Sequence, residues 1–247
     1  MSLTLKNNCR RAGDEFCLVL PAWSALKVVE AIAPMLAEGW AWRGRDLTHA
    51  MGLVFCHHKT PIQEVRRLAE NLAESAKGLC DEQGRNIGRL GNYLQAMVLM
   101  GMDPPAGGVK TFRDAHYQCA EARPFSFDLS LFDQTMATMK EFLGLAEGPG
   151  GKISEGVPPS QLFKIRGLAL DAGLLNQPEE APAFQAWLKA ADEKLKEYAD
   201  SRGKPFSWQH LKGPHMAYDS HYPLMPLFHL LHLGEYVEPF QNRGGAA

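Results

Sequence analysis

The feature that most constrains the fold is an apolar run that passes directly into an amphipathic helix. Residues 49–58, HAMGLVFCHH, form a short apolar stretch bounded by polar residues, which is typical of a buried strand. Thr60 and Pro61 follow, and these residue types favour the N-cap and the first position of a helix. Apolar residues then recur every three or four positions as far as Ala76. The sequence therefore predicts a strand followed by a helix that packs on it.

A second unit of the same kind precedes the first. Residues 16–20, FCLVL, suit a strand that Pro21 stops, and the segment after it has helical apolar spacing up to Gly39, which is expected as the C-cap. Residues 84–90 and 93–102 are predicted as further short strands.

Two adjacent acids, Asp14 and Glu15, follow Gly13 between apolar, strand-like segments. We expect residues 9–20 to form an antiparallel hairpin with these residues at its turn. One interpretation is a solvated polar turn, since glycine and aspartate are common in turns. The other is a metal-binding turn, where adjacent carboxylates hold Mg²⁺ against nucleotide phosphates.

The composition changes at residues 103–108, DPPAGG, which predicts a linker or domain edge. Beyond it the pattern predicts helices only, with no sheet after about residue 110. The expected helices lie near 127–144, 158–173, 181–201 and 222–235.

Charge and cysteine usage exclude some classes of function. With 26 basic and 28 acidic residues, the chain has no global field for nucleic acid or for an anionic membrane. No leader precedes the apolar segments, and the apolar runs are too short to span a bilayer, so a cytoplasmic protein is expected. The five cysteines form no C-x-x-C pair and are predicted to be buried thiols in a reducing compartment. They are Cys9, Cys17, Cys56, Cys80 and Cys119.

Two pairs of histidines raise the question of a metal site. His57 and His58 adjoin in a predicted strand, where neighbours point to opposite faces, so we expect one buried and one exposed imidazole. His229 and His232 are three residues apart on an apolar helix, but no acid or cysteine shares their face. Core packing is therefore the favoured interpretation for this second pair.

In their order along the chain, these pieces resemble the GGDEF nucleotide-cyclase superfamily. The segment GLVFCHHKTPIQEV, residues 52–65, is most similar to the second palm domain in the large subunit of type III CRISPR effector complexes, where a strand ends in His-His-Lys-x-Pro. The helix ending ESAKGLCDEQGRN, residues 74–86, and the helical tail also fit that subunit. The resemblance covers residues 7–90 in motifs and the remainder only in architecture.

The resemblance implies a fold and a set of site residues. The fold is α+β, with an incomplete ferredoxin-like palm over 1–105 followed by an all-helical domain over 106–247. Asp14 and Glu15 would be the catalytic and metal-binding residues, holding Mg²⁺ or Mn²⁺. Gly13, Lys77 and Arg85 would contact the nucleotide, with ATP as the substrate. From the residues alone, a helix-terminal lysine and an exposed loop arginine remain equally good interpretations of that last pair.

The resemblance also implies an activity and partners. The parent subunit joins ATP molecules into cyclic oligoadenylates, and it works with other CRISPR effector subunits and with guide and target RNA. Ala12 replaces the first glycine of the family turn. In the family, the strand that supplies a further carboxylate precedes the hairpin by a whole strand–helix unit, but only about a dozen residues precede the turn here. The chain is therefore interpreted as a fragment or degenerate relative that is inactive alone.

Two rival functions remain open. One is a non-catalytic scaffold that docks neighbouring subunits through the helical domain. The other is a diguanylate cyclase-like signalling domain that uses GTP, which the His-His-Lys-x-Pro segment and the helical tail disfavour. An incomplete palm also leaves an open sheet edge, where self-association is expected.

Overall fold

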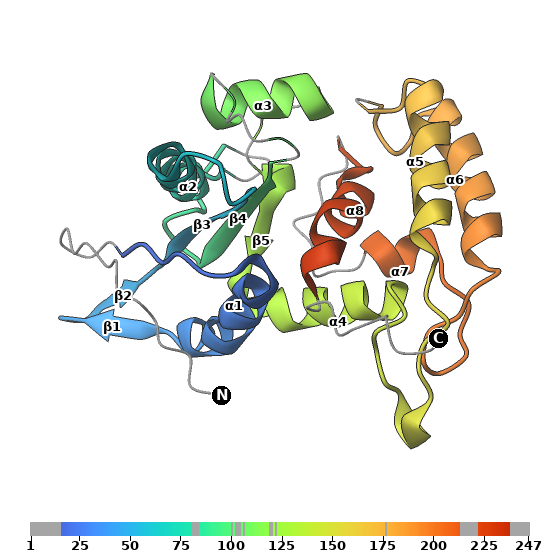
Figure 1. Ribbon diagram of the computed structural model, residues 1–247, viewed down its shortest axis with the longest axis horizontal. Helices are drawn as coiled ribbons and strands as arrows, with labels where there is room; N and C mark the ends of the chain where they lie inside the picture. Colours follow the sequence, from blue (N-terminus) through green and yellow to red (C-terminus); the bar gives the residue numbers. More distant parts are fainter. Residues whose placement is uncertain are drawn as a thin grey trace.

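The structure is a computed structural model, and it describes residues 16–80, 84–99, 101, 105, 107–118, 121, 123–175, 177–212 and 222–237. These residues form a mixed α+β fold, as the sequence predicts (Figure 1). The helices are α1 (Ala22–Ala37), α2 (Ile62–Lys77), α3 (Gly108–Tyr117), α4 (Phe132–Phe142), α5 (Pro159–Asp171), α6 (Pro182–Leu195), α7 (Trp208–Lys212) and α8 (Met225–Val237). The strands are β1 (Trp40–Trp42), β2 (Arg45–Leu47), β3 (Ala50–Phe55), β4 (Tyr93–Val98) and β5 (Ser126–Asp128), and the 3-10 turns are η1 (Arg123–Phe125), η2 (Leu129–Leu131) and η3 (Pro149–Gly151).

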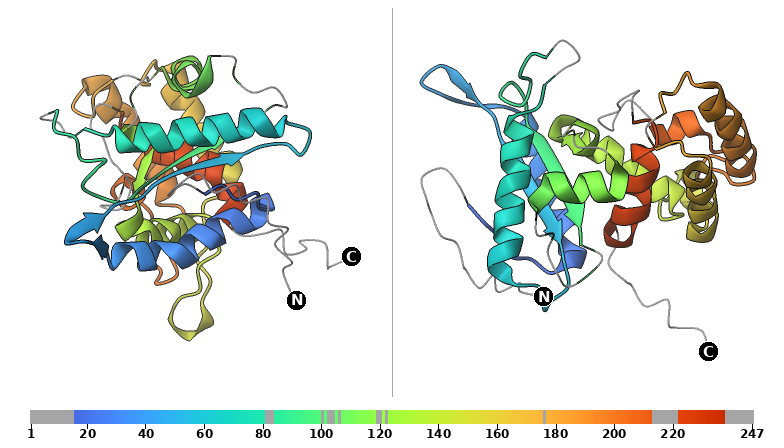
Figure 2. Two further views of the ribbon diagram at one scale, coloured as in Figure 1. Left: turned by 90° about the vertical axis from the view of Figure 1, so that its left-hand side faces the viewer. Right: turned by 90° about the horizontal axis from the view of Figure 1, so that it is seen from above.

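The main sheet has the order β3-β4-β5. β3 pairs with β4 in parallel, and the connection between them contains α2, which packs on both strands. α2 lies very close to β3, because a Cβ added at Gly52 would sit 1.9 Å from the carbonyl oxygen of Ala69. Figure 2 shows α2 on one side of the sheet and α1 on the other. The strand and helix predicted between residues 49 and 78 are thus confirmed.

The N-terminus of α2 differs in detail from its prediction. Pro61 occupies the N-cap position, and no side-chain hydrogen bond caps the helix. The first helical residue is Ile62, so Thr60 lies one residue further from the helix than expected.

A separate two-stranded hairpin, β1-β2, was not anticipated from the sequence. Its two turn residues, Arg43 and Gly44, have φ of 52° and 74°. Positive φ at both central residues is the geometry of a type I′ turn, which matches the twist of a two-residue hairpin. The hairpin sits between α1 and β3, within the predicted first domain.

The helices that follow β5 lie to one side of the sheet, with α8 nearer to it than α5 and α6 (Figure 1). α1, α4 and α8 contact one another, and α5 contacts both α6 and α8 (Figure 1). One cluster of buried side chains runs from α1 through the sheet to α8. The division into domains at residues 105 and 106 remains a prediction, and both the core and the sheet extend across it.

The expectation of no strand beyond residue 110 is wrong, because β5 pairs antiparallel with β4. Its three residues are too few to give a periodic signal. Ser126 and Phe127 are both buried, so the alternation of buried and exposed residues that marks a strand is also missing. The four predicted helices are observed, although α4 begins only after β5 and η2.

Two other predicted strands are absent from the described residues. Residues 16–20 form no strand there, and Phe16 and Val19 are exposed. A strand requires a hydrogen-bonded neighbour, and β3 pairs only with β4 in the described sheet. Residues 9–15 of the predicted hairpin lie outside the described residues. The 84–90 segment makes a single bridge, between Asn86 and Cys80.

In the described part of the chain, no helix is long and apolar enough to cross a bilayer.

Candidate functional site

The three residues of the predicted metal turn, Gly13, Asp14 and Glu15, lie outside the residues that the structure describes. Their assignment to metal and nucleotide binding therefore stays a prediction. The other two predicted site residues, Lys77 and Arg85, are both described.

Lys77 and Arg85 belong to one turn region at the end of α2. Lys77 is the last residue of the helix, and its side chain is 44% exposed. The chain then folds back, with the Ile87 N–H donating to the Leu79 carbonyl at 2.8 Å. The bridge between Cys80 and Asn86 brings the segment that carries Arg85 alongside the segment that follows Lys77.

A close backbone contact holds this turn against the helix. A Cβ added at Gly88 would lie 2.2 Å from the Ala76 carbonyl oxygen, so only glycine allows this approach. The Lys77 Nζ atom lies 2.7 Å from the Glu74 Oε1 atom, an exposed pair one helical turn apart. Because Lys77 is the last residue of α2, its charge also complements the negative end of the helix macrodipole.

The turn lies at the end of the sheet where the chain enters β3 and β4. Because α2 returns antiparallel to the strands, its last residue lies beside the start of β4 rather than beside its end. The Thr48 hydroxyl, two residues before β3, donates to the Arg89 carbonyl at 3.5 Å. The His49 N–H donates to Asn92 Oδ1 at 2.8 Å. The site therefore combines exposed cationic side chains with a rigid frame.

The prediction of one buried and one exposed imidazole at His57 and His58 is wrong. Both residues are exposed, and their rings are tilted by 40° to one another with centroids 4.1 Å apart. The reason is that β3 ends at Phe55, so strand alternation no longer applies to the residues after it.

The cysteines within the described residues are less buried than expected. Cys80 is exposed, and Cys17 and Cys56 are partly buried. Burial raises the pKa of the Cys56 thiol, while the nearby Thr60 hydroxyl acts in the opposite direction. Cys9 and Cys119 lie outside the described residues.

A buried polar network, which sequence reasoning missed, joins the sheet to α2 and α3. Arg113, on α3, is only 3% exposed, and its Nη2 atom donates to Gln95 Oε1 at 2.5 Å. Gln95 Nε2 donates in turn to Ser126 Oγ at 2.9 Å, which connects β4 with β5. Arg113 Nη1 donates to Ser75 Oγ at 3.3 Å, and the guanidinium lies 4.5 Å from the centroid of the Phe125 ring.

Two histidines of α8 extend this polar region. His229 is buried, which confirms the packing prediction, and burial together with His232 and Arg113 lowers its pKa to about 3. His232 accepts or donates a 2.8 Å hydrogen bond between its Nδ1 atom and the Tyr117 hydroxyl. Burial and the nearby Arg166 charge lower the pKa of His232 to about 4. Burial also disfavours the charged form of Tyr117, and this raises the pKa of its hydroxyl to about 12.

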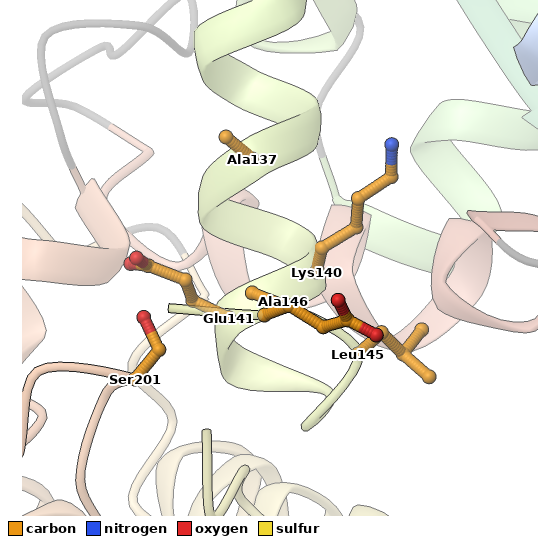
Figure 3. Close-up of a pocket in the computed structure, with 7 residues that line it drawn as sticks. Ala137, Lys140, Glu141, Leu145, Ala146 and Ser201 are labelled. Carbon is orange, nitrogen blue, oxygen red and sulfur yellow. The ribbon is translucent and has the colours of Figure 1, made fainter. Parts of the chain in front are cut away.

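A separate surface hollow of about 470 Å³ lies at the end of α4 (Figure 3). Its polar lining residues are Lys140, Glu141, Glu147 and Ser201. Figure 3 shows the Lys140 side chain extending away from Glu141 and Ser201.

The charged groups of this hollow also join elements of the fold. Lys140 Nζ lies 2.6 Å from Glu30 Oε1, and Glu141 Oε2 lies 3.0 Å from His210 Nε2. These bonds connect α4 to α1 and to α7, so they are accounted for by helix packing.

Among the described residues, no group of three or more histidine, cysteine or acidic side chains is arranged to hold a metal ion. No family model, curated protein or solved structure matches the chain.

Proposed function

We propose that this chain is part of a nucleotide-cyclase-type palm with an attached helical unit, of the kind found in the large subunit of type III CRISPR effector complexes. Its role is to bind ATP with Mg²⁺ or Mn²⁺ within a larger complex that includes other effector subunits and guide and target RNA. The parent reaction is the joining of ATP into cyclic oligoadenylates.

The observation that carries the proposal is the placement of the motif residues at element boundaries. The His57-His58-Lys59 segment lies between β3 and α2, and Lys77 is the final residue of α2. The turn that carries Arg85 then returns to the same helix end. This strand, helix and cationic turn are the layout that the resemblance implies.

Lys77 and Arg85 suit the binding of a triphosphate. A lysine ammonium and an arginine guanidinium both form charge-assisted hydrogen bonds to phosphate oxygens. In phosphoryl transfer such groups act by positioning and by stabilising developing negative charge. The proposed metal ligands are Asp14 and Glu15, with Gly13 allowing close approach of the phosphate.

The described sheet does not supply a third metal-binding carboxylate. Its only acid is Asp128, which ends β5 and accepts hydrogen bonds from the Ser130 N–H at 2.9 Å and from the Ser130 hydroxyl at 2.6 Å. Mg²⁺ requires near-octahedral oxygen ligands, and two-metal catalysis requires both ions to be held firmly. We therefore propose that the isolated chain binds nucleotide weakly and is inactive, and that another segment or subunit provides the missing ligand.

The test combines ATP binding with product analysis. We expect saturable binding of ATP in the presence of Mg²⁺, and we expect the Lys77→Ala, Arg85→Ala double variant to raise Kd by about tenfold or more. Lys164→Ala, on the exposed face of α5, is the control and should leave Kd unchanged. The isolated chain should form no oligonucleotide from radiolabelled ATP. Binding that is identical in all three proteins would contradict the proposed site.

A non-catalytic docking role is a second candidate, and the free edge of β3 favours it. In the described sheet β3 pairs on one side only, and the docking role would place an added strand on its other side. Self-association through this edge is one form of such docking. A concentration-dependent increase in mass, measured by sedimentation, together with an absence of ATP binding, would favour this function over the first.

A further inference from the structure

A small, partly open cavity lies where β4, α3 and α8 meet. Its volume is about 20 Å³, which is enough for one particle about the size of a water molecule. The lining includes apolar side chains of β4 and four polar residues. These are Arg113, Tyr117, His229 and His232.

One wall of the cavity carries an imidazole with an unsatisfied nitrogen. His229 is 8% exposed, and its Nδ1 atom is buried and makes no hydrogen bond to any residue that the structure describes. A buried polar atom without a partner is costly, so its presence beside a cavity points to a ligand. In the tautomer with its proton on Nδ1, His229 would donate a hydrogen bond into the cavity.

The other polar groups around the cavity are either arginines or groups that already form a hydrogen bond. Arg113 lines the wall and is only 3% exposed, and its positively charged guanidinium also donates to Gln95 Oε1 and Ser75 Oγ. The Tyr117 hydroxyl is hydrogen-bonded to His232, at 2.8 Å. Arg166 lies nearby, with its guanidinium 5.2 Å from the centroid of the Phe228 ring, next to His229 on α8.

Positive charge in a region of low dielectric attracts an anion much more strongly than it attracts a neutral water molecule. We propose that this cavity binds one chloride-sized anion, held by the His229 imidazole and by the charge of Arg113. The anion would hold α8 to α3 and β4, and so contribute to stability at the junction between the sheet and the helices.

Thermal unfolding of the full chain tests this site. We would replace sodium gluconate stepwise with sodium chloride at constant ionic strength and measure Tm. Because a ligand that binds only the folded state stabilises it, we expect a saturable rise of about 3–6 °C when chloride is at tenfold its Kd. The His229→Leu variant should lose this rise.

The matched control is His210→Leu, the same substitution at a histidine of α7 that does not line the cavity. It should keep the chloride-dependent rise even if its Tm is lower throughout. A rise of equal size in all three proteins, or no rise in the wild type, would overturn the proposal.

Anomalous diffraction from wild-type crystals grown in sodium bromide provides a measurement that does not depend on the folding of any variant. The expected result is one bromide peak within the cavity, beside the Nδ1 atom of His229. A cavity without an anomalous peak would show that it holds water or is empty, and the proposal would be wrong.

Discussion

The substitution Gln95→Leu should destabilise the protein through the buried polar network. Gln95 is fully buried on β4, and leucine has a similar size but neither a donor nor an acceptor. The change removes the acceptor of the Arg113 Nη2 hydrogen bond and the donor to Ser126 Oγ. Two buried polar groups thereby lose a hydrogen bond at once.

The magnitude follows from those two bonds. The bond from Arg113 is charge-assisted and is worth about 1.5–3 kcal/mol, and the neutral bond to Ser126 about 0.5–1.5 kcal/mol. We therefore expect the free energy of unfolding to fall by roughly 2–4 kcal/mol. Gln185→Leu is the control, because this exposed glutamine donates to a surface carbonyl, and it should change stability by about 0.5 kcal/mol or less.

The assay is urea unfolding followed by far-UV circular dichroism. A double-mutant cycle with Arg113→Met separates the Gln95 contact from the other contacts of the arginine. We expect the double variant to be less destabilised than the sum of the single variants, by about 1.5–3 kcal/mol, because neither Gln95 nor Arg113 is then left buried without the other. If Gln95→Leu unfolds like the control, or if the two changes simply add, the network does not have the role described.

Two further predictions concern protonation and close packing. Because burial holds the pKa of His229 at about 3 and of His232 at about 4, both below the ordinary 6.5, the unfolded chain binds more protons as pH falls below 6.5. In chloride-free buffer, stability should fall between pH 6.5 and 5 by up to about 1.4 kcal/mol per pH unit per histidine, and His229→Phe should reduce that slope; a flat urea midpoint over this range would count against the assignment. Gly52→Ala should lower stability by about 1–3 kcal/mol, because the new methyl group meets the Ala69 backbone, whereas Gly167→Ala on α5 meets open space and should raise it by about 0.8–1 kcal/mol. Thermal unfolding distinguishes the two glycines, and equal shifts would contradict the packing of α2 on β3.

The sequence predicted those elements whose pattern is long and periodic. The helix over 62–77 and the strand over 50–55 were identified because apolar spacing, a helix-start signal and an apolar run agree there. β5 and the ten-residue α3 were missed, since the first has three residues and the second begins at Gly108. The strand expected at residues 16–20 was wrong because a strand also requires a neighbouring chain, which local pattern does not provide.

Of the two candidate sites, one was identified from the sequence and the other was not. The family resemblance directed attention to Lys77 and Arg85, which the chain brings into one turn region. The buried network was not predictable, because it pairs Gln95 with Arg113 and Ser126, which are 18 and 31 positions away. Each of these residues alone has an ordinary surface interpretation, and only the fold brings them together.

The most direct test of the proposed function is a titration of Mn²⁺ into the full chain, with and without ATP, followed by electron paramagnetic resonance of the free ion. We expect the chain to remove the free Mn²⁺ signal saturably, ATP to strengthen this binding, and an Asp14→Ala, Glu15→Ala double variant to abolish it. The matched control is Glu193→Ala on α6, an exposed acid that should leave binding unchanged. Equal Mn²⁺ binding by the wild type and the Asp14, Glu15 double variant would contradict the assignment of this chain to a nucleotide-cyclase-type palm.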